Sequence, residues 1–498
     1  MHRKSYGELR AAYRAGTCSP VSVAESALAH AEQVQESLNA FALIDHERAL
    51  ALAAASEQRW KQGAPLGPLD GMPITVKEFA AVQGWPTRRG SLVTSTDPAP
   101  QSAVFVERLL QAGVVLLGKT RAPEFNWKGV TDSPGYGVTR NPLNPKLTPG
   151  GSSGGCSAAV AAGVVRVSLG SDAGGSVRIP AAFTGTVALK PTFGRIPLAP
   201  PPSAFFNVVN TGPIAASVSE LSEVMQVVSG PHAGDWSSIG LRELAFDVIP
   251  QASGLRIGLL KDDRWSGSDP VVLQGMKEVT DLFSQGGFEV SSVDFDVRRA
   301  SEVGAFFYML GCRTAVQAVP EARRGQLDPA LLEFVEPVQD VTFEDLLKMQ
   351  QARDALAGEL HGLFKTVDVL MLPTMPILPF EAGRNTPKDW DSSDWMSWNP
   401  FTPAFNLTQA PAVSFPIWPQ GAALPMSVQF VGARGHDEVV LALASWLEQR
   451  RPITLRARRR NLCRGAQMKK LLVYATVALC FGSSAMSSSF AGPIGYLG

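Results

Sequence analysis

Apolar residues recur every three or four positions along the N-terminal part of the chain, which is the spacing of amphipathic helices. Residues 5–62 are therefore predicted to be helical. Ser19 followed by Pro20 is a typical helix start, because serine caps the first turn and proline fits its first position. No set of catalytic side chains stands out here, so we expect these helices to cover one side of a core.

Farther along the chain, short continuous apolar runs alternate with helical patterns. The runs predict buried strands at 74–79, 113–120, 255–260, 287–293 and 368–373. The helical patterns predict helices at 102–110, 271–285 and 341–366. Such alternation favours an α/β fold. We expect a single domain with N-terminal helices and three α/β/α layers, whose large central sheet is mixed and mostly parallel.

The composition is that of a large globular protein. Of the 498 residues, 45% are hydrophobic and 18% are charged, which excludes a disordered chain. Lysine plus arginine and aspartate plus glutamate are equal at 45 each, so no net field favours nucleic acid or an anionic membrane. The five cysteines show no metal-binding or CxxC spacing, which predicts reduced thiols and a cytoplasmic location.

The stretch richest in glycine and serine runs from Thr148 to Lys190. It contains GGSSGG at 150–155 and SDAGGS at 171–176, with a small apolar segment between them. Glycines are used where the backbone takes unusual conformations or approaches another group closely. The stretch is either a pair of tight turns around a helix or an active site in which glycine amides surround a nucleophilic serine.

Lys77 lies near the end of a short apolar run, ITVKEF at 74–79. An isolated lysine in such a place usually extends its ammonium group to solvent. Alternatively it is buried, and desolvation then lowers its pKa until the neutral amine can act as a base. The residues around Lys77 do not decide between these two possibilities.

Two familiar patterns occur in surroundings that do not suit them. GVVLLGKT at 113–120 matches GxxxxGK[ST], but a helix is predicted before it and VVLL is typical of a buried strand, which speaks against a phosphate loop. GSSGG at 151–155 fits the GxSxG turn of α/β-hydrolases, whose chemistry needs a histidine. The downstream candidates are His232, His361 and His436, and none has motif-like neighbours.

Three segments together resemble the amidase signature family. They are PLGPLDGMPITVKEF with Lys77, TPGGSSGGCSAAVAAG with Ser152, and SDAGGSVRIPAAFTGTVALKPTFGRI with Ser176. Flanking likeness extends the resemblance over nearly all of residues 1–450.

The resemblance implies a Ser–cisSer–Lys triad formed by Ser176, Ser152 and Lys77. In the implied mechanism, neutral Lys77 accepts a proton from Ser152, Ser152 takes one from Ser176, and Ser176 attacks the amide carbonyl. Ser152 then protonates the departing amine, and water hydrolyses the acyl-enzyme. The oxyanion is expected to be held by the backbone N–H groups of Ala173, Gly174 and Gly175.

The sequence departs from the commonest family pattern at two positions. Glu78 stands where many members have aspartate, and Cys156 where many have serine, and neither change removes a proton-relay atom. Asp172 is expected to fix the loop rather than to react. Two roles stay open for Arg178, which either anchors a substrate carboxylate or braces the fold.

The resemblance predicts an amidase that hydrolyses a carboxylic amide without metal or organic cofactor. Aromatic residues at 390–401 and at Phe205 and Phe206 either pack in the core or line the cleft, and in the second case the substrate is apolar or aromatic. The alternative within the family is the glutaminase component of a glutamyl/aspartyl-tRNA amidotransferase, which needs partner subunits. We expect a small-molecule amide as the partner, no nucleic acid and no membrane, and a homodimer is possible.

The resemblance also divides the chain. It predicts an N-terminal helical cover at 1–62, an amidase signature core at 63–452 and a tail at 453–498 outside the family. From Met468 the tail has a charged start, an apolar run and small residues, which is the layout of a secretory signal. We interpret it as the product of read-through or of fusion with a neighbouring reading frame.

Overall fold

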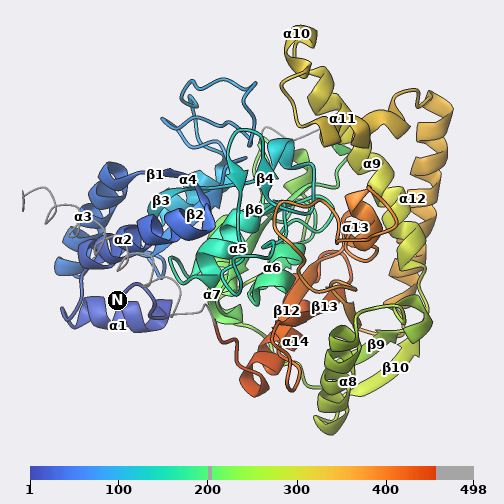
Figure 1. Ribbon diagram of the computed structural model, residues 1–498. Coiled ribbons are helices and arrows are strands. Elements are labelled where there is room, and N and C mark those ends of the chain that lie inside the picture. Colours follow the sequence, from blue (N-terminus) through green and yellow to red (C-terminus); the bar gives the residue numbers. More distant parts are fainter. Residues whose placement is uncertain (200–204, 456–498) are drawn as a thin grey trace, which may run out of the picture. The chain divides into compact units, whose positions relative to one another are not determined.

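The computed structural model describes residues 1–199 and 205–455 (Figure 1). The strands are β1 (Phe41–Ile44), β2 (Pro73–Lys77), β3 (Val115–Thr120), β4 (Asp132–Ser133), β5 (Gly137–Val138), β6 (Val167–Asp172), β7 (Val187–Lys190), β8 (Asn210–Ala215), β9 (Arg256–Leu260), β10 (Glu289–Val293), β11 (Val369–Pro373), β12 (Ala412–Ile417) and β13 (Met426–Gly432). The α-helices are α1 (Tyr6–Arg14), α2 (Pro20–Leu38), α3 (His46–Lys61), α4 (Val104–Gln111), α5 (Gly154–Ala161), α6 (Arg178–Thr184), α7 (Val218–Val228), α8 (Pro270–Gln285), α9 (Val297–Gln317), α10 (Glu321–Arg324), α11 (Pro329–Val335), α12 (Phe343–Leu363), α13 (Pro403–Leu407) and α14 (Asp437–Arg450).

One sheet of 11 strands runs through the described part of the chain, in the order β1-β3-β2-β6-β8-β7-β12-β13-β11-β9-β10. The parallel pairs are β2–β3, β2–β6, β9–β10 and β9–β11. The antiparallel pairs are β1–β3, β6–β8, β7–β8, β7–β12, β12–β13 and β11–β13. The sheet is mixed, as predicted, but the expectation that it is mostly parallel is wrong. Strands buried on both faces have the same apolar composition whichever way they run.

Helices cover both faces of this sheet, which gives the three layers predicted (Figure 1). Successive side chains of β3 point to opposite faces of the sheet, and both faces are covered. Val115 and Leu117 pack in one apolar cluster with Ala27 of α2, whereas Leu116 packs in another with Leu109 of α4. The first face carries α2, α3, α5 and α6, and the second carries α4, α7, α8 and α14.

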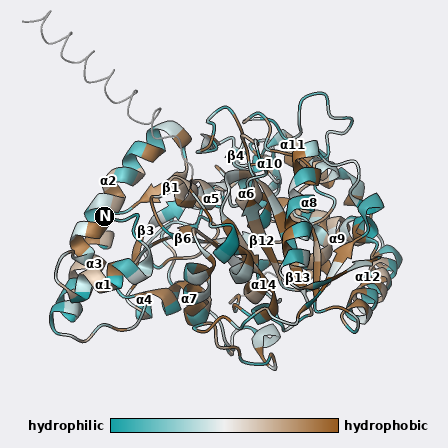
Figure 2. Ribbon diagram, turned by 90° about the horizontal axis from the view of Figure 1, so that it is seen from below, coloured by the Kyte–Doolittle hydropathy of each residue, from teal (hydrophilic) through white to brown (hydrophobic). Residues whose placement is uncertain are grey.

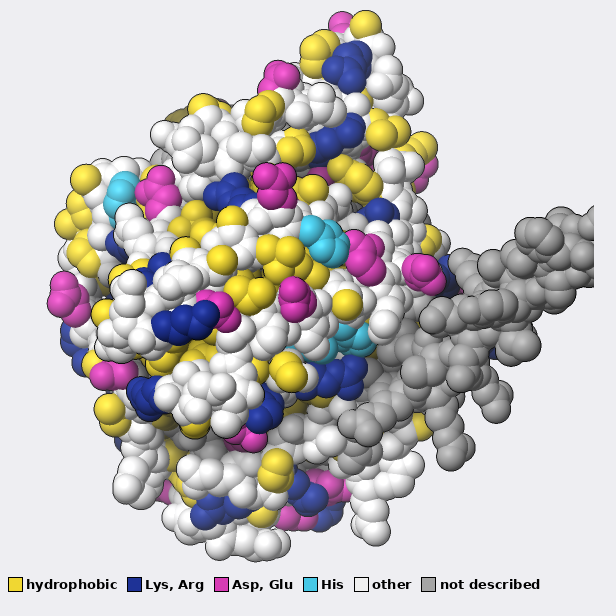
Figure 3. Space-filling model, turned by 90° about the vertical axis from the view of Figure 1, so that its left-hand side faces the viewer, with side chains coloured by type: hydrophobic (Ala, Val, Ile, Leu, Met, Phe, Trp, Pro, Cys, Tyr) yellow, Lys and Arg dark blue, Asp and Glu magenta, His cyan; other side chains and the backbone are white. Residues whose placement is uncertain are grey.

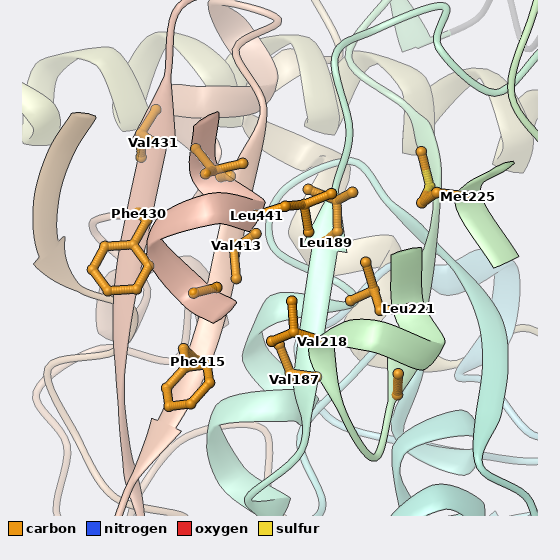
Figure 4. Close-up of a cluster of buried hydrophobic side chains, with 14 of the residues drawn as sticks. Val187, Leu189, Val218, Leu221, Met225, Val413, Phe415, Phe430, Val431 and Leu441 are labelled. Carbon is orange, nitrogen blue, oxygen red and sulfur yellow. The ribbon is translucent and has the colours of Figure 1, made fainter. Parts of the chain in front are cut away.

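The larger of these clusters forms the main core. Figure 4 shows part of it, in which side chains of β7, β12 and β13 meet those of α7 and α14. Leu189 and Leu221 are completely buried there. Burying apolar surface contributes roughly 25 cal/mol per Å², so this cluster stabilises the central strands that lead to the candidate site. In Figure 2, β12 and β13 are coloured mainly as hydrophobic, while the helices around them are mixed.

Local signals set the starts of the N-terminal helices. The Ser5 side chain caps α1 by accepting from Glu8 N–H, and Ser19 caps α2 with Pro20 in the first turn, as predicted. The expected helical stretch is interrupted by β1, which pairs antiparallel with β3. A strand of four residues is too short for apolar spacing to separate it from a helix.

The other predicted elements lie close to their expected places. Strands β2, β3, β9, β10 and β11 and helices α4, α8 and α12 overlap the segments named from the sequence. The predicted division at residues 62 and 452 stays a prediction, and residues 456–498 of the predicted tail lie outside the described residues.

No helix within residues 1–199 or 205–455 is long and apolar enough to cross a bilayer. On the face shown in Figure 3, basic and acidic side chains are intermixed, so this face carries no large patch of one charge.

Candidate active site

The C-terminal ends of β2 and β6 bring the candidate residues together. The two strands pair in parallel, and β2 ends at Lys77 while β6 ends at Asp172. Parallel neighbours end at the same edge of a sheet. Lys77 therefore lies beside Ser171 of β6, and the loop 173–176 begins at this edge.

Lys77 is completely buried, and its side-chain nitrogen has two hydroxyl partners. Nζ donates to Ser152 Oγ at 2.7 Å and to Ser171 Oγ at 2.9 Å. Burial lowers the pKa of Lys77 to about 7, an effect that the nearby Cys156 and Asp172 oppose. Of the two possibilities left open by the sequence, the structure has the buried lysine.

Ser152 lies in a glycine-rich turn directly before α5. The Gly151–Ser152 peptide bond is cis. A side chain at position 151 would collide with the backbone of Val130, so only glycine fits there. The next residue ties this turn to the second glycine-serine cluster, because Ser153 N–H donates to Ser176 O at 3.0 Å.

Ser176 faces a large cavity. It is 3% exposed and lines, together with Ser152 and Ser171, a cavity of about 650 Å³. Within the described part of the chain, the Ser176 hydroxyl forms no hydrogen bond with Ser152, so the expected relay is open between these two residues. Catalytic hydrogen bonds are often long before substrate binds, and both hydroxyls face the same space.

The peptide between Gly174 and Gly175 is held at both ends. Gly174 O accepts from Asn399 Nδ2 at 2.8 Å and from Thr402 Oγ1 at 2.7 Å. Gly175 N–H donates to Asp172 Oδ1 at 2.8 Å. Two side chains from a distant segment and one from β6 therefore fix the orientation of this loop.

The hydrogen bonds of this loop determine which of the three backbone N–H groups predicted to hold an oxyanion are free to do so. The Gly175 N–H is engaged by Asp172, which speaks against the role expected for it. Among the described residues, the N–H groups of Ala173 and Gly174 have no hydrogen-bond acceptor. Ala173 also lines the cavity that Ser176 faces.

Asp172 and Arg178 form an ion pair behind the loop. Their side chains are 0% exposed and lie 2.9 Å apart, and Arg178 also donates to Asn406 Oδ1 at 2.6 Å and Gln429 Oε1 at 2.8 Å. Although burial raises it, the Arg178 guanidinium holds the pKa of Asp172 well below its usual range. Arg178 does not line the cavity, so it braces the fold rather than a substrate. Asp172 fixes the loop, as expected.

Apolar side chains dominate the cavity lining. Its aromatic members are Phe79, Phe105, Phe125, Phe205 and Tyr308. Trp395, Trp398 and Phe401 are buried in the core instead. Of the two aromatic groups found in the sequence, one contributes Phe205 to the lining. The other packs inside the protein, except for Trp390, which is exposed.

The two competing sequence patterns do not build sites. Residues 115–120 form the buried strand β3, and Lys119 Nζ donates to Pro86 O at 2.7 Å. Ser153, the serine of the GxSxG pattern, donates to Ser171 O at 3.1 Å, and no histidine is among the described residues lining the cavity. No group of three or more His, Cys, Asp or Glu residues in the described segments could hold a metal ion.

The sequence analysis gave no role to three polar residues of the site. Ser171 stands inside the SDAGGS cluster, and pairing β2 with β6 would have placed it beside Lys77. Asn399 and Thr402 lie 225 and 228 positions from Gly174, whose carbonyl they contact, so no local pattern signals them.

Comparisons with known proteins place the chain among the amidases. A family model described as Amidase matches residues 22–441. An acylamidase from Rhodococcus erythropolis is 31% identical over 467 residues, which cover 91% of this chain and 96% of that protein. A glutamyl-tRNA(Gln) amidotransferase subunit from Chloroflexus aurantiacus is 30% identical over 472 residues, which cover 89% of this chain and 95% of that protein.

Solved structures share the fold over the same extent. A bacterial aryl acylamidase belonging to the amidase signature enzymes superposes with a TM-score of 0.81 at 28% identity, covering 90% of this chain and 96% of that one. A 6-aminohexanoate cyclic dimer hydrolase superposes with a TM-score of 0.82 at 27% identity, covering 93% and 99%.

Proposed function

This chain belongs to the amidase signature family and is a hydrolase acting on amide bonds, and from that premise we propose that it cleaves an apolar or aryl carboxylic amide to acid plus amine or ammonia. The proposed catalytic residues are Ser176, Ser152 and Lys77. One observation carries the proposal: a completely buried lysine of lowered pKa contacts Ser152 at the edge of a cavity that Ser176 also lines.

Lys77 is the proposed base. With a pKa of about 7, a large fraction of it is uncharged at neutral pH, and a neutral amine 2.7 Å from Ser152 Oγ can accept its proton. Ser152 in turn accepts the proton of Ser176 when substrate in the cavity brings the two hydroxyls together. Ser176 attacks the carbonyl carbon, the proton returns through Ser152 to the departing nitrogen, and water hydrolyses the acyl-enzyme.

The developing oxyanion is assigned to the N–H groups of Ala173 and Gly174. Neither donates elsewhere among the described residues, whereas the Gly175 N–H donates to Asp172. A well-placed backbone donor stabilises such a transition state by roughly 3–4 kcal/mol. The two hydrogen bonds that Asn399 and Thr402 donate to Gly174 O, called the clamp below, keep the loop in one orientation and so preorganise the two N–H donors.

The cavity supports an apolar substrate. Its volume of about 650 Å³ suits a small molecule rather than a polypeptide segment, and aromatic rings such as Phe79, Phe125 and Phe205 line it. Rings of this kind stack on aryl groups and bury alkyl groups. An acylamidase and an aryl acylamidase are among the similar proteins, which fits such a substrate.

A glutaminase is the second candidate, because the glutamyl-tRNA(Gln) amidotransferase relative matches about as well as the acylamidase does. Glutamine carries both an ammonium and a carboxylate on its α carbon. A binding site for it needs groups of both charges, and no Asp or Glu is among the described residues lining the cavity. We therefore place the stand-alone amidase first.

We also propose a cytoplasmic location. Cys18, Cys156 and Cys312 are free thiols, as expected in a reducing compartment. The small-molecule partner, the homodimer and the absence of a nucleic-acid partner stay predictions.

The test is an activity panel on the purified full-length chain, with aryl amides, aliphatic amides and glutamine as substrates. We expect turnover of simple amides without any other protein present. Ser176→Ala should abolish it and Lys77→Ala should lower it by orders of magnitude while circular dichroism stays unchanged, with the surface variant Ser284→Ala as control. Activity on glutamine alone, dependent on added partner proteins, would favour the second candidate, and near-normal rates in Ser176→Ala would refute its role.

A further inference from the structure

Arg89 is the one charged side chain among the described residues that line the cavity. It is exposed at the surface end of the cavity, and among the described residues its guanidinium has no hydrogen-bond or ion-pair partner. Every other described lining residue is apolar or carries a neutral polar group. A substrate in this cavity therefore meets an uncompensated positive charge and no negative charge.

The backbone holds Arg89 firmly in this place. Its φ of 52° is in the left-handed region, which a residue other than glycine adopts only where its surroundings enforce it. Arg89 O accepts from Phe125 N–H at 2.8 Å, and the next residue, Gly90, donates its N–H to Glu78 Oε2 at 2.9 Å. A side chain at position 90 would collide with the backbone of Ala122. The guanidinium thus extends from a fixed point.

We infer that the preferred substrate of the proposed amidase carries a carboxylate, which Arg89 binds at the surface end of the cavity while the apolar body fills the interior. This inference rests on the proposed function and narrows its substrate class. A guanidinium offers a planar pair of N–H donors that matches a carboxylate. The interaction is stronger beside apolar walls than in open solvent, because the effective dielectric constant is lower there.

Matched anilides test the inference. One pair carries a carboxylate or an isosteric isopropyl group at the far end of the acyl chain, and the second pair carries the same two groups on the aniline ring. For at least one pair we expect wild-type kcat/KM to favour the carboxylate. In Arg89→Gln, the ratio of carboxylate to isopropyl kcat/KM should fall about tenfold or more, mainly through KM, as charge-assisted bonds predict. Arg89→Lys should lie between the two.

Arg14→Gln is the control, because Arg14 is an exposed arginine on α1, away from the cavity lining. Its substrate ratio should equal that of the wild type. If Arg89→Gln leaves the ratio unchanged in both pairs, the inference is overturned while amide hydrolysis stands. If wild-type enzyme hydrolyses none of the four anilides and none of the simple amides in the activity panel, the proposed function itself fails. Calorimetric binding of the uncleaved anilides to Ser176→Ala then still measures the carboxylate preference, and equal affinity for both members of each pair overturns it.

Discussion

Lys77 Nζ lies 2.7 Å from Ser152 Oγ, and both residues are completely buried. Burial disfavours the ammonium form and lowers the pKa of Lys77 to about 7. Both protonation states are therefore populated near neutral pH, and only the neutral amine can accept the proton of Ser152. The charge state of one buried lysine thus determines whether the proposed relay can start.

The first prediction is the pH dependence of the reaction. Because the pKa of Lys77 is lowered rather than raised, the inactive ammonium form dominates below about pH 7. kcat/KM on an uncharged amide should fall about tenfold for each pH unit below that value and level off above it. The measurement is a kcat/KM profile over the pH range in which the fold is retained.

Lys190 supplies a matched control for this profile. It is another completely buried lysine, and burial, reinforced by Arg178, lowers its pKa to about 7 as well. Lys190 does not line the cavity, and its Nζ donates to Pro191 O at 2.8 Å. Lys190→Met should keep the acid limb of the profile. If this limb disappears in Lys190→Met, Lys77 is not the group that titrates.

The second prediction concerns Ser171. Its hydroxyl accepts from Lys77 Nζ at 2.9 Å, which favours the charged form and orients the amine. Ser171→Ala should lower the pKa of Lys77 further, so the acid limb moves to lower pH, and kcat should fall roughly 10- to 100-fold as the amine loses its orientation. Ser171→Thr, which keeps a hydroxyl, should restore much of the rate. Lost activity with an unmoved acid limb would indicate a purely structural role.

Much of the fold could be predicted because apolar spacing reports burial directly. The runs at 255–260 and 368–373 became β9 and β11, and the capping signal at Ser19 marked the start of α2. Apolar spacing could not predict whether neighbouring strands run parallel or antiparallel. β7 and β8 pair antiparallel in the middle of the sheet, yet both are as completely buried as parallel strands and show no alternation of polar residues.

The candidate residues Lys77, Ser152 and Ser176 could be named from the sequence because they lie in contiguous motifs, and their catalytic roles stay a proposal. The sequence does not show which backbone N–H groups of SDAGGS at 171–176 are free, because that depends on the Gly175 N–H turning toward Asp172. The contacts of Asn399 and Thr402 with the loop could not be predicted either. These residues belong to a segment whose aromatic composition was interpreted as a possible substrate-binding surface.

The third prediction tests that clamp. Thr402→Val and Asn399→Ala each remove one donor from Gly174 O, and both side chains are buried away from the cavity lining. A hydrogen bond of this kind contributes roughly 0.5–1.5 kcal/mol, so each change should lower kcat by about tenfold at most. KM should change less, because the cavity walls stay in place.

The two clamp variants should not be additive, since both act on one peptide group. Thr408→Val is the control, because among the described residues its hydroxyl donates only to Ala404 O at 2.9 Å, in the same segment. A rise in KM with kcat unchanged would contradict a positioning role for Asn399 and Thr402.

The fourth prediction is about stability. Asp172 and Arg178 are paired at 2.9 Å with both side chains 0% exposed, so Asp172→Ala leaves a guanidinium buried without its counter-ion. Breaking such a pair by removing one partner costs about 3–5 kcal/mol of unfolding free energy. Urea denaturation at pH 7 should show this loss.

Because the folded-state pKa of Asp172 is lowered, the stability that it contributes is present above about pH 4 and shrinks as the pH falls further. Asp281→Ala removes an exposed partner of Lys277 instead and should change the free energy by less than about 1 kcal/mol. Equal stabilities of Asp172→Ala and Asp281→Ala would show that the buried pair does not hold the loop.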